Sequence, residues 1–279
     1  MSNYVVSDTT LTSVADAIRT KGGTSAQLEW PDEFISAIGA ISGGSDTLTD
    51  LLNNTMTTLE YNGTASILQD FAKDKTSLTS VSMPNVTTIG ANAFNGCTNV
   101  ATCNFSNLTT LGAYGFYKFG AGVLTTMHLP KLTTGQTNYN FGYMGTSAKP
   151  VTLVLPSVVS LGTDAFRGGY FDAVDIGPNL AEFNNRTFYS MGKMDAIILR
   201  KADGLVTLTN TNSISSLTSA TTIYIPKALY DHLGDGSASD YKAATNWTTK
   251  ATTVTWACIE GSQYETAYAD GTTITGVSA

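Results

Sequence analysis

The sequence predicts a mainly β solenoid of short strands, with a small N-terminal helical module and an α/β C-terminal cap. Three observations lead to this prediction. Short runs of residues alternate between apolar and polar, a Pro often follows each run, and the pattern recurs every 21 to 26 residues. A period of this length is typical of solenoids, in which no single repeat can bury its own apolar face.

The composition agrees with a polar-surfaced scaffold. The chain has 279 residues, of which 42% are hydrophobic and 13% are charged, and its formal net charge is −7. We expect no nucleic-acid binding, because an acidic chain lacks the basic face that neutralises phosphates. No apolar run reaches the roughly 18 residues that span a bilayer, so membrane insertion is not expected either.

The N-terminal residues 1–41 are predicted to form two short helices. Gly22-Gly23 ends the first helix, and Pro31 stands at the first position of the second. Helices this short bury too little surface to be stable alone, so we expect this module to attach to a partner. Residues 42–47 contain a Gly/Ser run and are predicted to be a flexible linker.

Residues 48–226 carry the repeats. The segment from Val81 to Phe94 aligns with the segment from Leu153 to Phe166 at every apolar position, including a Pro and a Gly in each. The repeats are predicted to begin at residues 81, 103, 127, 153, 174, 197 and 223. This period indicates a leucine-rich repeat in particular.

The pattern predicts a structural role for each part of a repeat. Its first residues alternate as a short strand, and the Pro that follows stops the strand because it has no N–H. The next apolar pair turns inward, the following Gly permits a sharp bend, and a closing Phe is expected to stack with its equivalents in a column. The repeats that begin at residues 127 and 174 depart from the pattern. In the first, Gly135 stands where Ile89 would be and Phe141 arrives one residue late, and the second has one inserted residue at Gly177-Pro178.

Residues 227–279 are predicted to cap the solenoid. Ala228, Leu229, Tyr230 and Leu233 have the spacing of a short helix, and a second helical segment is expected from Tyr241 to Trp247. Near the end, Asp270-Gly271 lies between Ala and Thr residues and predicts a hairpin that seals the last repeat.

The residues offer little catalytic chemistry. His128 and His232 each lack a neighbouring His or Cys, and three cysteines give no disulfide framework, so we expect those thiols to be small buried groups. Sequence motifs of metalloproteases, serine hydrolases and phosphate-binding loops are missing. We therefore expect no enzyme activity, no cofactor and no metal.

The turns after each Gly or Phe are where the repeats differ most, and they carry the candidate recognition residues. Stacked repeats would bring these side chains into a row along one flank. Tyr offers a large contact area at low entropic cost, and Asn adds hydrogen bonds. The alternative is that some of the aromatic rings pack under neighbouring loops, and Phe119 is expected in the core. The candidates are Tyr114, Tyr117, Asn138, Tyr139, Asn140, Tyr143, Arg167, Tyr170, Asn185 and Tyr189.

Three segments resemble known proteins. Residues 78–100, LTSVSMPNVTTIGANAFNGCTNV, resemble the BspA-type leucine-rich repeat of bacterial surface proteins. Residues 223–251 are similar to the cap that follows such repeats in Firmicute and Firmicute-phage proteins. Residues 6–41 resemble an N-terminal module of prophage and phage tail-associated proteins. The resemblance implies a role in adhesion and transfers no catalytic motif.

The favoured interpretation is a phage tail-associated receptor-binding protein located in the virion tail. Its solenoid would contact a host cell-surface protein or glycan, and residues 1–41 would contact other virion proteins. The N-terminus lacks the basic and apolar regions of a secretion signal, and this favours the phage interpretation. The alternatives are a bacterial cell-surface adhesin, whose signal and anchor were trimmed, and a structural virion spacer. The sequence does not fix the oligomeric state, and a homo-oligomer is one of the alternatives.

Overall fold

The computed structural model describes residues 48–64, 66–136 and 138–266, so the predicted helical module 1–41 and linker 42–47 lie outside the described residues. The chain divides into two units, residues 1–59 and 60–279. The described part of the first unit contains helix α3 (Leu48–Leu52) and strand β1 (Thr58–Glu60), which ends at the boundary. The range predicted for the solenoid therefore begins with a helical turn rather than with a strand.

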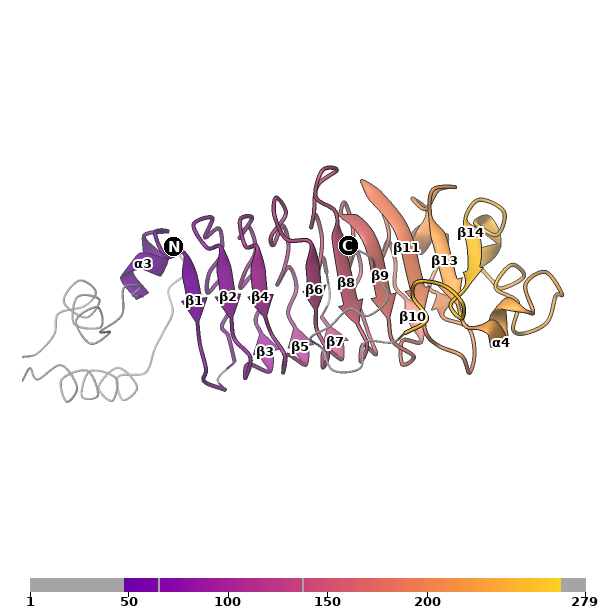
Figure 1. Ribbon diagram of the computed structural model, residues 1–279, viewed down its shortest axis with the longest axis horizontal. Coiled ribbons are helices and arrows are strands. Elements are labelled where there is room, and N and C mark those ends of the chain that lie inside the picture. The colour runs from indigo at the N-terminus through magenta and orange to yellow at the C-terminus, as the bar shows by residue number, and fades with distance from the viewer. Residues whose placement is uncertain (1–47, 65, 137, 267–279) are drawn as a thin grey trace, which may run out of the picture. The chain divides into compact units, whose positions relative to one another are not determined.

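The second unit is a β-solenoid, and the first strand of each repeat forms one long face of it. These strands lie side by side in sequence order (Figure 1), and each hydrogen-bonded pair is parallel. β2 pairs with β4, whereas the strands from β6 onward form a continuous six-stranded sheet. The strands of this long-strand face are β2 (Ser80–Ser82), β4 (Thr102–Asn104), β6 (Thr126–His128), β8 (Val151–Leu155), β9 (Tyr170–Ile176), β11 (Lys193–Leu199), β13 (Thr222–Ile225) and β14 (Thr255–Cys258).

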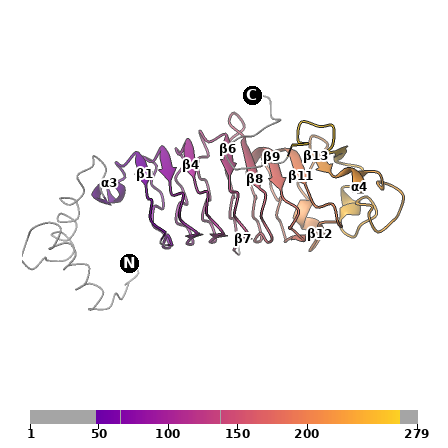
Figure 2. The same ribbon diagram turned by 60° about the horizontal axis from the view of Figure 1, so that its bottom comes forward.

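A second set of very short strands lies on the opposite edge of the coils, where Figure 2 shows β7 and β12. Ile89, Leu111 and Gly135 occupy equivalent positions in neighbouring strands. The predicted replacement of Ile89 by Gly135 in the register is therefore confirmed. The strands are β3 (Thr88–Ile89), β5 (Thr110–Leu111), β7 (Thr134–Gly135), β10 (Glu182–Phe183) and β12 (Thr207–Leu208).

The turns form a third hydrogen-bonded ladder along the solenoid. Six successive turns each have two residues of left-handed backbone, four positions apart. From Asp70 to Gly168 the N–H of each such residue donates to a carbonyl of the next coil. Tyr114 N, for example, donates to Asn138 O at 2.9 Å, and Tyr139 N donates to Thr163 O at 3.1 Å. The first left-handed residues, with φ between 51° and 58°, are Asp70, Asn92, Tyr114, Tyr139, Asp164 and Arg186. The second are Asp74, Gly96, Lys118, Tyr143, Gly168 and Ser190.

A column of phenylalanine rings fills the solenoid interior, as predicted. Successive ring centroids along the column are 6.1, 6.2, 5.8 and 5.1 Å apart. In the first coil Ala72 takes the equivalent place, and the neighbouring Phe71 packs edge-on against the next ring at 6.3 Å. Offset and tilted ring pairs of this kind add stability beyond their buried area. The fully buried rings of the column are Phe94, Phe116, Phe141, Phe166 and Phe188.

The glycines after the short strands serve close packing between coils, which corrects the prediction of a sharp bend. Gly90 and Gly112 do not have positive φ angles. A Cβ on Gly112 would lie 2.6 Å from the backbone N of Ala91 in the preceding coil. The missing side chain therefore allows two coil backbones to approach each other.

We expect Gly112→Ala to lower the free energy of unfolding by about 1–3 kcal/mol, because the added methyl group must push two backbones apart. Urea unfolding followed by circular dichroism measures the change. Gly122→Ala is the matched control, since the nearest atom to its Cβ is 3.9 Å away. Equal stabilities of the two variants would contradict this explanation.

The C-terminal cap covers the last coil through two buried aromatic side chains. The indole N–H of Trp247 donates to Val206 O at 2.8 Å, and Val206 N donates to the hydroxyl of Tyr241 at 2.9 Å. The predicted first helix is confirmed as α4 (Lys227–Tyr230), and a short 3-10 helix, η1 (Thr211–Ile214), precedes it in the chain. The second helical segment, predicted from Tyr241 to Trp247, is wrong: turns occupy residues 241–246, and only the short 3-10 helix η2 (Trp247–Thr249) follows.

The last described strand continues the solenoid. β14 pairs in parallel with β13 and so adds one more strand to the long-strand face. The Asp270-Gly271 turn on which the hairpin prediction rested lies outside the described residues.

Candidate recognition surface

Five of the predicted recognition tyrosines and one arginine form a continuous row across successive turns. The ring of Tyr139 stacks on that of Tyr114 at 4.9 Å, and the ring of Tyr117 contacts those of Tyr139 and Tyr143 at 5.8 and 5.3 Å. We call this set the tyrosine–arginine row. Its members are Tyr114, Tyr117, Tyr139, Tyr143, Arg167 and Tyr189.

Arg167 connects the two ends of the row. Its guanidinium lies 5.5 Å from the ring centre of Tyr139 and 5.1 Å from that of Tyr189. The buried carboxylate of Asp164 pairs with Arg167 at 3.4 Å and with Arg186 at 2.7 Å. Two guanidinium groups share one carboxylate, so this end of the row carries a net positive charge in an acidic protein.

The backbone under the row is strained. Tyr114, Tyr139 and Tyr143 all have left-handed φ angles, between 51° and 57°. Asn and Asp tolerate this conformation best among residues with a side chain, and Asn92 and Asp164 stand where neighbouring coils have Tyr114 and Tyr139. Tyr114 and Tyr139 thus each cost about 1 kcal/mol more than Asn or Asp would at the same position. Residues kept in such conformations cluster at functional sites.

Glycine residues, which have no side chain, lie beneath two of the rings. A Cβ on Gly168 would lie 2.6 Å from the Tyr143 ring, and a Cβ on Gly142 would lie 2.9 Å from the Tyr139 ring. Both rings therefore pack against glycine backbone, and the ring of Tyr139 also contacts Tyr114 and Arg167. Tyr143 and Tyr189 are 37% and 36% exposed.

The hydroxyls of Tyr117 and Tyr139 stay neutral over the physiological range, because the pKa of each is raised. Burial, together with the neighbouring phenol of Tyr143, raises the pKa of Tyr117 above its ordinary value. Burial, together with the carboxylate of Asp164, likewise raises the pKa of Tyr139. The row therefore offers apolar ring surface, hydroxyl groups and the cation Arg167. A second cation, Lys118, lies beside the row with its ammonium 5.5 Å from the centre of the Tyr117 ring.

Asn140 does not belong to this surface, which corrects the prediction. Its side chain is fully buried and occupies the space left by Gly135, whose Cβ would lie 2.6 Å from Asn140 Oδ1. The amide donates to Gln136 O at 2.9 Å, and its oxygen accepts from Gly162 N at 3.3 Å. A small residue in the strand has drawn a polar side chain from the turn into the interior.

The three other predicted residues have different surroundings. Asn138 is exposed and lies beside Tyr139 in the chain, and Asn185 is half-buried. Tyr170 begins β9, and its ring covers the backbone of Gly192, outside the tyrosine–arginine row. Phe119 is fully buried, as predicted.

Sequence reasoning missed Asp164 and Lys118, although a signal for the turn positions was available. Residues 70, 92 and 164 are Asp or Asn at equivalent points of their repeats. Such a recurrence predicts left-handed backbone, and it would have indicated that Tyr114 and Tyr139 are strained.

The remaining reactive groups show no assembled chemistry. Burial raises the pKa of the Cys97 thiol to about 12, and the thiol donates to Ala72 O at 3.0 Å. Cys103 and Cys258 are free and half-buried rather than buried, which corrects that part of the prediction. Within the described residues no group of three His, Cys, Asp or Glu could hold a metal ion. None of the helices described is long and apolar enough to cross a membrane.

Parallel coils that stack on a phenylalanine column, with variable side chains displayed along the turns, define a leucine-rich-repeat solenoid of about seven turns. Six copies of the BspA type Leucine rich repeat region match residues 66–153 and 137–240, and the chain belongs to this family. Among curated proteins, none matches the chain. The family suggests surface adhesion or recognition, and its members are typically non-enzymatic repeat proteins.

Proposed function

We propose that the protein is a phage tail-associated receptor-binding protein, which contacts the surface of a Firmicute host through the tyrosine–arginine row. The observation that carries the proposal is the strained backbone of Tyr114, Tyr139 and Tyr143 beneath half-exposed rings. Packing does not require tyrosine at positions 114 and 139, because Asn92 stands at the equivalent place in another coil. Clustered Tyr and Arg side chains are the commonest hot spots of binding surfaces.

The virion location rests on the resemblance of residues 6–41 to a module of phage tail-associated proteins. In this proposal residues 1–41 bind other tail proteins, and the solenoid binds a protein or glycan of the host surface. The family favours one other candidate, a bacterial cell-surface adhesin that uses the same row.

The test measures binding of the fluorescently labelled full chain to a panel of intact Firmicute cells. We expect Tyr139→Asn to weaken binding to a responsive strain at least tenfold, while the melting temperature stays the same or rises. The reason is that Asn loses the ring but fits the left-handed backbone better. Tyr230→Asn, a substitution of an exposed tyrosine outside the row, is the matched control and should bind normally.

A large loss of stability in Tyr139→Asn would instead assign the ring to packing and contradict the proposed role. The same protein also separates the two candidates. A tail protein should inhibit adsorption of phages to the strains that it binds, whereas an adhesin should leave adsorption unchanged. Binding to no strain by the folded protein would favour a structural spacer.

A further inference from the structure

A hollow lies on the outer side of the long-strand face, and none of the residues that line it belongs to the tyrosine–arginine row. The register places Thr152, Ala173, Ala196 and Thr222 in one line across four neighbouring strands. The two central strands carry Ala where the flanking strands carry Thr. This change leaves a hollow of about 500 Å³, which is within the size range of small-molecule sites.

One wall of the hollow is aromatic. The segment after β14 crosses the outer side of the sheet, where Tyr264 meets Tyr224 with ring centroids 4.7 Å apart. This segment is fixed in place, because Arg200 donates to Tyr264 O at 3.0 Å while it binds the buried carboxylate of Asp175 at 2.8 and 2.7 Å. The aromatic wall is therefore held rigidly before any ligand arrives.

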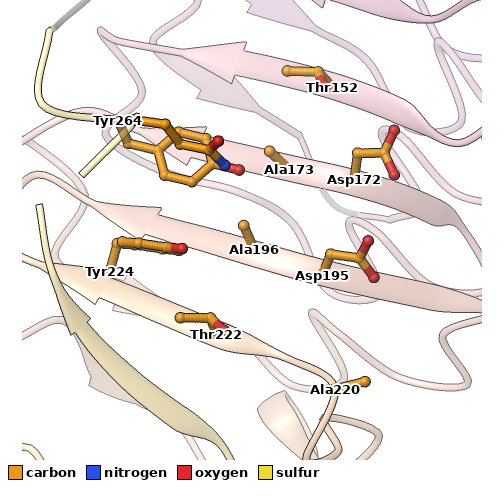
Figure 3. A pocket seen from close by; sticks show the side chains of 10 residues that line it. Thr152, Asp172, Ala173, Asp195, Ala196, Ala220, Thr222, Tyr224 and Tyr264 are labelled. Atoms are coloured by element: carbon orange, nitrogen blue, oxygen red, sulfur yellow. The ribbon is translucent and has the colours of Figure 1, made fainter. Parts of the chain in front are cut away.

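The opposite wall is polar. Figure 3 shows Asp172 and Asp195 at one end of the hollow and the two tyrosines at the other, with Ala173 and Ala196 between them. The ammonium of Lys193 lies 2.6 Å from Asp172 Oδ1 and 2.9 Å from Asp195 Oδ2. It orders both carboxylates and offsets part of their charge, while both carboxylates remain about half exposed.

We propose that this hollow binds a neutral saccharide unit. The apolar face of a sugar ring fits against a tyrosine ring and over a floor of two small Ala residues. Its hydroxyl groups would donate to the Asp172 and Asp195 carboxylates, and such charge-assisted hydrogen bonds are the strong ones. Thr152 and Thr222 line the sides and add hydroxyl groups. The site does not depend on the proposed role of the tyrosine–arginine row.

The test titrates the full chain with glucose, galactose, rhamnose, N-acetylglucosamine and maltose, with saturation-transfer NMR as the readout. We expect at least one of them to bind with an affinity of about 1 mM. Tyr224→Ala should weaken this binding at least tenfold, and Asp195→Asn should weaken it severalfold. Tyr230→Ala and Asp231→Asn change the same residue types outside the hollow and should bind as the parent does.

Several results would overturn the proposal. The proposal is wrong if the protein binds none of the five sugars. It is also wrong if sugar binding is unchanged in both Tyr224→Ala and Asp195→Asn. Preferential binding of spermidine would show that the carboxylates recognise a cation instead. If Tyr224→Ala loses folded structure by circular dichroism, Asp195→Asn alone decides the outcome, because its side chain is about half exposed. Tyr139→Asn must retain sugar binding, since a loss would place the sugar on the tyrosine–arginine row.

Discussion

Phe141→Ala is expected to lower the free energy of unfolding by about 3–5 kcal/mol. Phe141 is fully buried and lies between Phe116 and Phe166, with centroids 6.2 and 5.8 Å away. Truncation opens a cavity in the middle of the column and removes contacts to both neighbouring coils. Because each coil of a solenoid is stabilised by its neighbours, the loss weakens two interfaces at once. Urea unfolding of the full chain, followed by far-ultraviolet circular dichroism, measures it.

The matched control is Tyr143→Ala, a truncation of a ring two residues further along the same turn. Tyr143 is 37% exposed, so we expect no more than about 1 kcal/mol of destabilisation. If both variants lost the same stability, the phenylalanine column would not be the main interior support at this coil. If Phe141→Ala were as stable as the parent, the prediction would be wrong, because the neighbouring coils would then have closed the cavity at no cost in stability.

Trp247→Ala is expected to destabilise the protein to a similar extent, about 3–5 kcal/mol, because it opens the end of the solenoid. The Trp247 ring contacts those of Phe183 and Tyr241 at 6.5 and 5.2 Å. Its N–H also satisfies Val206 O, a group of the last coils that would otherwise be buried without this donor. Loss of the ring therefore exposes the apolar end that a terminal cap must cover.

Trp247→Phe separates the two contributions. It keeps an aromatic ring but removes the hydrogen bond to Val206 O, and we expect a loss of about 1–3 kcal/mol. Thermal unfolding of both variants should rank the parent first, Trp247→Phe second and Trp247→Ala last. An Ala variant as stable as the Phe variant would show that the hydrogen bond, and not the ring, holds the cap.

The sequence alone determined the repeat architecture of this protein. Alternating runs such as Val81 to Met83, the period of 21 to 26 residues and the recurring Phe predicted the strands, the stacking and the phenylalanine column. These features depend on short-range patterns, and each repeat contacts mainly its neighbours, so a local pattern is enough to specify them. The candidate row followed from the same alignment, because stacking brings equivalent turns together.

Only the tertiary structure decided which side chains face outward and why. Asn140 and Tyr139 are neighbours in the same turn, yet the more polar Asn140 is buried in the space left by Gly135 and the aromatic Tyr139 lies at the surface. The hollow on the long-strand face depends on Tyr264, whose carbonyl oxygen accepts a hydrogen bond from Arg200, 64 positions away in the chain. The direction of a side chain depends on the space and the hydrogen-bond partners supplied by other coils, and those contacts exist only in the folded chain.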